Sequence, residues 1–290
     1  MKVLDISENS IVSLDLNGLE KLSFVDVRNC PLSTIVGTSA ASSVSSLDLS
    51  GTSIADISFI SDFSNLKKLS VKLNLVEDVS FLSALTSVED LTLIGLQKNE
   101  WSVFESMTEL KTLRILSSPI SQPSIRNLPK LEYVEINGCR SVTDISLITN
   151  LPSLTEMFIN KVDIPSPVVH GLPNLKKLTM TNADIEYVNM INDLPSLEYL
   201  DLSDNDFEAL EFGTSLPSLK YLDLSNSRIY VIDDLNITMN MGSLDISGNS
   251  VKKIGKLAEL FTELEYLDLS GNKIKDYSPL DSIQIGELVK

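Results

Sequence analysis

The stretch LEYLDLSDNDF at residues 197–207 decides the fold, because its spacing of apolar residues returns along the whole chain of 290 residues. The pattern is apolar-x-x-apolar-x-apolar, and it recurs every 21 to 23 residues. Thirteen copies in phase exclude coincidence. The copies begin at Met1, Leu22, Val44, Leu66, Val88, Leu110, Leu131, Leu154, Leu175, Leu197, Leu219, Met241 and Leu264.

Each copy predicts one short strand followed by a return segment. Two apolar residues separated by one position have the period of a strand, in which alternate side chains share a face. A unit of about 22 residues cannot bury its own apolar side, so neighbouring units must stack around one continuous core. The strands then form a parallel sheet whose intervening residues face solvent. A strand spacing of about 4.8 Å gives this sheet a length on the order of 60 Å.

A polar residue, most often asparagine, follows the strand in many copies, and an apolar residue follows two positions later. With this position included, the pattern resembles the leucine-rich repeat family, whose consensus is L-x-x-L-x-L-x-x-N/C-x-L. The resemblance covers essentially the whole chain and implies an α/β solenoid. The implied shape is a horseshoe with a concave parallel sheet of about 13 short strands and a convex side of 3-10 turns, loops and short helices. The position is filled by Asn9, Asn74, Asn205, Asn249 and Asn272, and by Cys30 and Cys139.

These asparagines predict a ladder of hydrogen bonds through the stack. One amide both donates and accepts, so each asparagine should point inward and bond the backbone of adjacent turns. Leu96, Val162 and Ala183 occupy the same position and cannot make such bonds. We therefore expect local breaks in the ladder at these copies.

Several return segments read Ile-x-Asp-Ile-Ser or a close variant, as at residues 54–58 and 274–278. They are similar to the 22-residue subclass of the family, which includes bacterial internalins and SDS22-like regulators of protein phosphatase 1. The internalin resemblance implies a receptor or adhesin ectodomain at the cell surface, whereas the SDS22-like resemblance implies an intracellular scaffold. A purely structural repeat region of a larger protein is a third alternative.

The net charge of the chain limits the classes of molecule that it can bind. A net charge of −17 and an isoelectric point near 4.4 disfavour nucleic acid and anionic membrane surfaces, because both would be repelled. The sequence has no apolar run long enough to insert into a membrane and no signal peptide, which leaves a protein or peptide partner. His170 is the only histidine, and neither a glycine-rich phosphate loop nor a Cys-x-x-Cys pair occurs. The sequence therefore predicts no enzyme and no cofactor.

The ends of the array give expectations about its context. We expect a single solenoid domain over residues 1–290. Met1 already fills the first apolar position of a copy, and Ile285 and Leu288 begin a fourteenth copy that does not finish. Solenoids normally close each end with an atypical capping repeat, and neither end shows one. We therefore expect the chain to be a segment of a longer protein.

The cysteines bear on the compartment. Cys30 and Cys139 stand five copies apart, or about 24 Å, which is too far for a disulfide. Buried free thiols suit a reducing compartment, and chance explains the single glycosylation sequon at residues 236–238. Both observations favour the cytoplasm for the chain as given, although a fragment of an exported protein would lie at the cell surface.

Aspartate fills the position between the two strand apolar residues near both ends of the array. Carboxylates would therefore stack on neighbouring strands, an arrangement that could bind calcium. Strand spacing is too wide for one ion that needs about six to eight oxygens at about 2.4 Å, which argues against calcium. The alternative is that nearby serines hold these side chains. The aspartates are Asp5, Asp26, Asp48, Asp201, Asp223, Asp245 and Asp268.

The middle of the array differs, because aspartate is absent from this position, which is filled by Ser70, Thr92, Arg114, Glu135, Phe158 and Thr179. Two positions further on, Ile94 and Leu116 also face solvent in their copies. Apolar and aromatic residues beside arginine are typical of the core of a protein interface, although drift within a tolerant repeat or ordinary cross-strand packing would give a similar pattern. We predict a non-catalytic protein–protein interaction module that binds its partner on the concave face. The predicted partner-binding residues are Lys68, Ser70, Lys72, Thr92, Ile94, Arg114, Leu116, Tyr133, Glu135, Phe158, Tyr199 and Tyr221.

Overall fold

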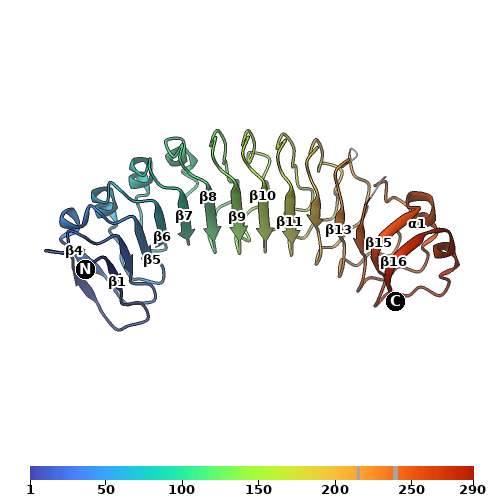
Figure 1. Ribbon diagram of the computed structural model, residues 1–290, viewed down its shortest axis with the longest axis horizontal. Helices are drawn as coiled ribbons and strands as arrows, with labels where there is room; N and C mark the ends of the chain where they lie inside the picture. Colours follow the sequence, from blue (N-terminus) through green and yellow to red (C-terminus); the bar gives the residue numbers. More distant parts are fainter. Residues whose placement is uncertain (214–215, 238–240) are drawn as a thin grey trace.

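The computed structural model describes residues 1–213, 216–237 and 241–290, and these residues form an arch with the two termini at opposite ends (Figure 1). One parallel sheet of fourteen strands runs the length of the arch, and successive copies lie side by side in it. The strands are β1 (Val3–Asp5), β3 (Phe24–Asp26), β5 (Ser46–Leu49), β6 (Lys68–Lys72), β7 (Asp90–Ile94), β8 (Thr112–Leu116), β9 (Tyr133–Asn137), β10 (Glu156–Asn160), β11 (Lys177–Thr181), β12 (Tyr199–Asp201), β13 (Tyr221–Asp223), β14 (Ser243–Asp245), β15 (Glu263–Asp268) and β16 (Gln284–Val289).

The return segments carry short helices along the outer edge of the arch (Figure 1). Near the N-terminus, two of them instead form a small parallel sheet of β2 (Ser13–Asp15) and β4 (Thr34–Val36). The leucine-rich repeat horseshoe expected from the sequence is therefore confirmed. The helices are η1 (Thr38–Ala41), η2 (Ser58–Asp62), η3 (Ser80–Ala84), η4 (Trp101–Phe104), α1 (Gly255–Leu260) and η5 (Ser278–Ser282), of which only α1 is an α-helix and the others are 3-10 helices.

The aspartate of the Ile-x-Asp-Ile-Ser segments positions the start of a 3-10 helix. The Asp56 carboxylate accepts a hydrogen bond from the backbone N–H of Ser58, the first residue of η2, at 3.0 Å. The same bond occurs at Asp78 and Asp276, and at all three aspartates it holds the carboxyl pKa below its ordinary value. These residues of the return segments are thus structural, since they satisfy N–H groups that the short helix leaves unpaired.

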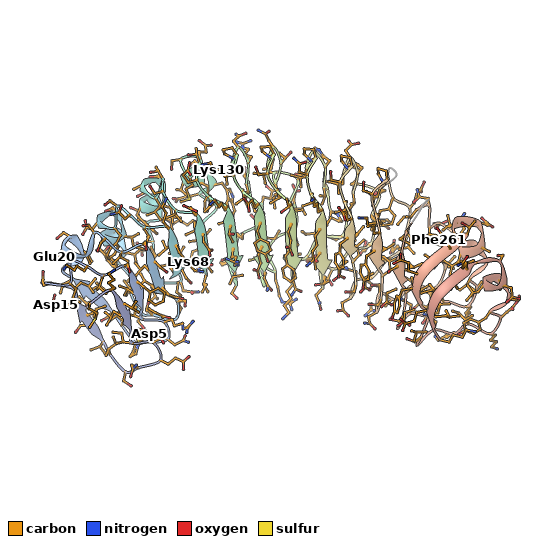
Figure 2. The ribbon with its side chains drawn as sticks, in the orientation of Figure 1. Asp5, Asp15, Glu20, Lys68, Lys130 and Phe261 are labelled. Atoms are coloured by element: carbon orange, nitrogen blue, oxygen red, sulfur yellow. The ribbon has the colours of Figure 1, made fainter. Side chains whose placement is uncertain are left out.

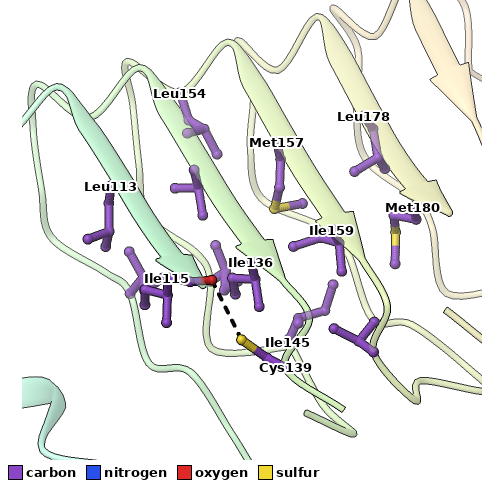
Figure 3. Packing of buried hydrophobic residues seen from close by; sticks show 14 of the residues in the cluster. Leu113, Ile115, Ile136, Cys139, Ile145, Leu154, Met157, Ile159, Leu178 and Met180 are labelled. Carbon is purple, nitrogen blue, oxygen red and sulfur yellow. Dashed lines mark hydrogen bonds between the residues drawn. The ribbon is translucent and has the colours of Figure 1, made fainter. Parts of the chain in front are cut away.

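The core is one continuous apolar column between the sheet and the return segments (Figure 3). Leu113 and Ile115 on β8 pack against the equivalent residues of neighbouring strands, and such residues are fully buried. The two cysteines also lie in this column as buried free thiols. The Cys139 thiol donates to the carbonyl of Ile115 at 3.5 Å, and burial raises its pKa.

The copy that the sequence leaves unfinished forms a complete strand. Ile285 and Leu288 on β16 pair in register with Leu264 and Leu267 on β15. The described sheet therefore has fourteen strands, where the sequence predicted about thirteen. The reason is that a parallel strand needs only hydrogen bonds to the exposed backbone of its neighbour. β15 supplies them to β16, so the pairing does not depend on a return segment after β16.

The asparagine ladder is confirmed where the side chain is buried. The Nδ2 group of Asn205 donates to the carbonyls of Met180 and Leu202 at 2.8 and 2.7 Å. Its Oδ1 atom accepts from the backbone N–H groups of Ala183 and Ile185, both at 3.1 Å. One amide thus ties the turn after β12 to the turn of the preceding copy, and Asn249 makes the equivalent bonds.

The prediction is wrong for Asn74. The structure buries Leu73 completely and leaves Asn74 exposed. Leu73 stands where the other copies have a residue with positive φ, a conformation that a leucine side chain disfavours. The turn therefore begins after Leu73, and Asn74 lies exposed. The residues with positive φ at this position are Glu8, Asn29, Gly51, Gly95, Ser117, Gly138, Lys161, Asn182, Asp204, Asn226, Gly248 and Gly271.

Candidate functional site

Strand side chains that alternate with the buried residues form a second surface, here called the open sheet face. The register aligns them in rows across neighbouring strands. The first row includes Lys68 on β6 and Tyr133 on β9, and the middle row includes Arg114 on β8. Lys68 lies toward the inner edge of the arch and Lys130, on a return segment, toward its outer edge (Figure 2). All twelve residues predicted from the sequence lie on the open sheet face.

Arg114 is the centre of a charged cluster over β6 to β9. Its Nη1 atom lies 2.8 Å from Oδ1 of Asp90, and its Nε atom lies 3.6 Å from Oε2 of Glu135. Its guanidinium also lies 5.2 Å from the centre of the Tyr133 ring, within the range of a cation–π contact. Lys68 contacts the other oxygen of Asp90 at 2.9 Å. Opposite charges on adjacent strands therefore hold the Arg114 side chain in one orientation.

This cluster changes the acidity of the Tyr133 phenol. Burial, followed by the charge of Glu135, raises the pKa of Tyr133 to about 12. Its hydroxyl contacts Oε2 of Glu135 at 3.3 Å. Ionised Tyr133 is thus disfavoured in the folded protein, and the stability linked to this group is present below pH of about 10 and is lost as the pH rises toward 12.

We expect a phenolate absorbance titration to detect this group. In the variant Tyr133→Phe, the absorbance gained above about pH 11 should fall by the equivalent of one tyrosine, because exposed tyrosines ionise near pH 10. The wild-type protein, titrated under the same conditions, is the reference for the size of this late change. A late titration of unchanged size in Tyr133→Phe would contradict the predicted pKa.

Apolar side chains interrupt the polar open sheet face in two places. Ile94 and Leu116 pair in the third row, on β7 and β8, and both are partly exposed. Phe158 is partly exposed in the middle row on β10, next to Glu135. Beside it, the Oδ1 atom of Asn160 is buried and has no hydrogen-bond partner in the described structure. The apolar side chains therefore lie on both sides of β9, as the pair Ile94 and Leu116 on β7 and β8 and as the single residue Phe158 on β10.

A second group of contacts extends over β10 to β13. Lys177 forms an ion pair with Glu156 at 3.0 Å and lies 5.3 Å from the centre of the Tyr199 ring. The rings of Tyr199 and Tyr221 stack at 4.5 Å, with their planes only 2° apart. Glu156 and Lys177 separate these tyrosines from Tyr133, so the tyrosines do not form one continuous strip.

Sequence reasoning missed three residues that organise this face, namely Asp90, Glu156 and Lys177. Each occupies the first row, in the same position of the repeat as Lys68 and Tyr133. That position could have been read strand by strand in the sequence. Their signal was the alternation of charge along the row rather than any unusual residue.

The aspartates of the middle row are held by their own strands. The Oδ1 atom of Asp48 accepts from the backbone N–H and the hydroxyl of Ser50 at 2.9 and 2.6 Å, and Asp201 bonds Ser203 in the same way. The sequence predicted this arrangement as the alternative to calcium. Within the described residues, no three His, Cys, Asp or Glu side chains come together as a metal site, and no helix is long and apolar enough to cross a membrane.

Comparison with known proteins agrees with this geometry. Residues 195–238 and 243–282 match a family model described as "Leucine Rich repeats (2 copies)". None of the curated proteins compared with the chain matches it.

Solved structures share the fold over nearly the whole chain. An internalin (inlF) from Listeria monocytogenes is similar with a TM-score of 0.60 and 23% identity, over 99% of this chain and 86% of that one. The APL1 leucine-rich repeat domain gives a TM-score of 0.74 at 16% identity, over 99% and 79% of the two chains. A chain of the Toll–Spatzle complex from Drosophila gives 0.67 at 14% identity, and this protein covers 43% of it. Identities this low support the fold alone.

Proposed function

We propose that this leucine-rich repeat protein is a non-catalytic module that binds a protein or peptide partner through its open sheet face, over β6 to β11. The observation that carries the proposal is that three apolar side chains are partly exposed on an otherwise polar face. They belong to Ile94, Leu116 and Phe158. The core of this protein is already filled from the other side of the sheet, so burial of these side chains needs a partner.

The charged cluster beside these residues supports the same proposal. Interfaces are enriched in arginine and aromatic side chains, and affinity is higher when such anchors are ordered before binding. Arg114 is held by Asp90, Glu135 and Tyr133 before any partner arrives. Partly exposed ion pairs contribute only about 0 to 1 kcal/mol each to folding, so stability alone gives little reason for this arrangement.

One of the solved structures with a similar fold gives a precedent for binding a protein partner. It is the Toll–Spatzle complex, in which two proteins associate. We propose a partner of the same class, protein or peptide, for this chain. His170 is exposed on a return segment, and no catalytic role is proposed for it.

The test is the triple variant Arg114→Ala, Glu135→Ala and Phe158→Ala. We expect it to lose the partner that the wild-type protein captures from its native cell extract, by about a hundredfold in affinity once the partner is purified. Capture followed by quantitative mass spectrometry, and then titration calorimetry, measure the loss. The thermal unfolding midpoint should change little, since all three side chains lie on the open sheet face.

The matched control is Glu109→Ala, Lys130→Ala and Tyr230→Ala. It also removes one acidic, one basic and one aromatic side chain; Lys130 lies 2.6 Å from Glu109, and Tyr230 is 65% exposed. These residues belong to the return segments, so the control should capture the partner as the wild type does. Equal capture by the triple variant on the open sheet face would exclude β6 to β11 as the binding surface.

A further inference from the structure

Two stretches of the open sheet face, β6 to β11 and β12 to β15, differ in how their acidic side chains are paired. On β6 to β11, the acidic side chains have basic partners within the chain, as in Lys68–Asp90–Arg114 and Lys177–Glu156. On β12 to β15, the middle row consists of four aspartates. In residues 1–213, 216–237 and 241–290, none of the four forms an ion pair. They are Asp201, Asp223, Asp245 and Asp268.

The four carboxylates lie in one registered row and repel one another. Asp201 pairs with Asp223, Asp223 with Asp245, and Asp245 with Asp268 on neighbouring strands. Burial raises the pKa of Asp201 and of Asp245, and the charge of Asp223 adds to both shifts. One oxygen of each aspartate accepts the backbone N–H two residues later. The strands therefore hold the carboxylates in place without neutralising them.

An aromatic row lies beside these carboxylates. Tyr199 and Tyr221 stack in parallel at 4.5 Å, and Tyr266 stands two strands further on, in the same row. The hydroxyl groups of Tyr221 and Tyr266 contact the outer oxygens of Asp223 and Asp268 at 3.2 and 3.1 Å. All three rings are partly exposed. Lysine and arginine favour such faces, because an aromatic ring attracts a cation and a carboxylate pairs with it.

We propose that β12 to β15 of the open sheet face bind an extended basic segment of a partner protein, with lysine or arginine side chains against the aspartates and over Tyr221 and Tyr266, because Lys177 already lies at the Tyr199 ring. This inference rests on the proposed function and names the chemistry of the partner. The row is about 14 Å long at strand spacing, which four or five residues of an extended segment span. A net charge of −17 steers a basic partner toward the protein and repels an acidic one.

The experiment titrates the full chain against a fluorescent synthetic peptide of alternating lysine and serine. A peptide of alternating glutamate and serine is the reference. We expect the basic peptide to bind and the acidic one not to bind. The variant Asp201→Asn with Asp245→Asn should weaken the basic peptide about tenfold in fluorescence anisotropy. Asparagine keeps the oxygen that accepts the N–H of Ser203 or Ser247, so the strands should fold as before.

The matched control separates a site from the general negative field. Asp233→Asn with Asp234→Asn also removes two negative charges, but from an exposed return segment. It should change affinity less than about twofold, because exposed charges away from the ligand are screened. Tyr221→Leu with Tyr266→Leu should weaken the basic peptide roughly threefold while leaving the charge unchanged. Equal losses in the two aspartate variants, or equal binding of the two peptides, would overturn the proposal.

The triple variant of Arg114, Glu135 and Phe158 distinguishes this inference from the proposed function. It should lose the captured partner yet keep at least part of its affinity for the basic peptide, because β12 to β15 are unchanged. If wild-type protein binds its partner through β6 to β11 but does not bind the basic peptide, only the inference about basic chemistry fails. If the basic peptide binds while the triple variant still captures its partner, the proposed function over β6 to β11 fails instead.

Discussion

Replacing Asn249 by alanine should lower the free energy of unfolding by about 3 kcal/mol or more, whereas the same change at Asn74 should alter it by less than about 0.5 kcal/mol. The two residues occupy the same position of the repeat in the sequence. Asn249 is 5% exposed, and Asn74 is exposed. The pair therefore tests the ladder with one substitution in two environments.

The large effect follows from the partners that the Asn249 amide leaves behind. Its Nδ2 group donates to the carbonyls of Leu224 and Ile246, both at 2.9 Å. Its Oδ1 atom accepts from the N–H groups of Ser227 and Ile229 at 2.9 and 3.0 Å. Alanine can replace none of these bonds, and each buried group left unpaired costs about 1 to 3 kcal/mol, reduced where water enters the cavity.

Urea unfolding followed by circular dichroism measures the difference. Hydrogen exchange should also show faster exchange at Ser227 and Ile229 in Asn249→Ala, since their N–H groups lose the acceptor. A solenoid can unfold in parts, so the loss should concentrate in the copies around β13 to β15. Equal destabilisation by the two variants would mean that the ladder does not hold adjacent turns together.

Leu73 shows why the sequence predicted the ladder well but not at every copy. The repeat pattern gave the strands, their order and their inward residues, because apolar spacing alone decides which side of a strand is buried. The turn after each strand depends on one residue with positive φ, and a leucine there changes which side chain points inward. A consensus position cannot reveal this change. The conformational preference of the residue before Asn74 can reveal it.

Ser118 is the opposite case, because it departs from the consensus and still takes part in the hydrogen-bond ladder. Serine does not match the consensus residue, yet its hydroxyl is buried, accepts from the N–H of Leu96 at 2.9 Å and donates to the carbonyl of Leu116 at 2.9 Å. The Ser118 hydroxyl thus bonds the backbone of the preceding copy, in which the Leu96 side chain can make no hydrogen bond. A small hydroxyl fits wherever backbone groups converge, so only the structure shows which serines take this place.

The sequence predicted which side chains of the candidate site share a face, but it did not predict which of them contact one another. The sequence placed Arg114, Tyr133 and Glu135 on one face, because strand alternation fixes the face. It could not show that Asp90 would attract Arg114 from the next strand, since the long arginine side chain has many rotamers available. The difference in ion pairing between β6 to β11 and β12 to β15 likewise depends on which charged side chains reach one another.

Replacing Gly37 by alanine should cost about 2 to 4 kcal/mol of stability, whereas Gly18→Ala should cost only about 1 kcal/mol. Both glycines lie in return segments near the N-terminus and have positive φ, at 72° and 79°. An added methyl group therefore meets the same backbone strain at both positions. The difference between the variants isolates the contact that the methyl group makes.

At Gly18 an added Cβ has no atom within 4 Å, but at Gly37 it would lie 2.5 Å from the backbone nitrogen of Asn17. That nitrogen already donates to the Asp15 carboxylate at 2.8 Å, so it cannot move away without loss of this bond. The pairing of β2 with β4 should separate as the two return segments move apart. Urea unfolding and hydrogen exchange at Leu16, whose N–H donates to the carbonyl of Val36, measure both effects. Equal costs at the two glycines would show that backbone strain, and not the close approach of adjacent copies, limits this position.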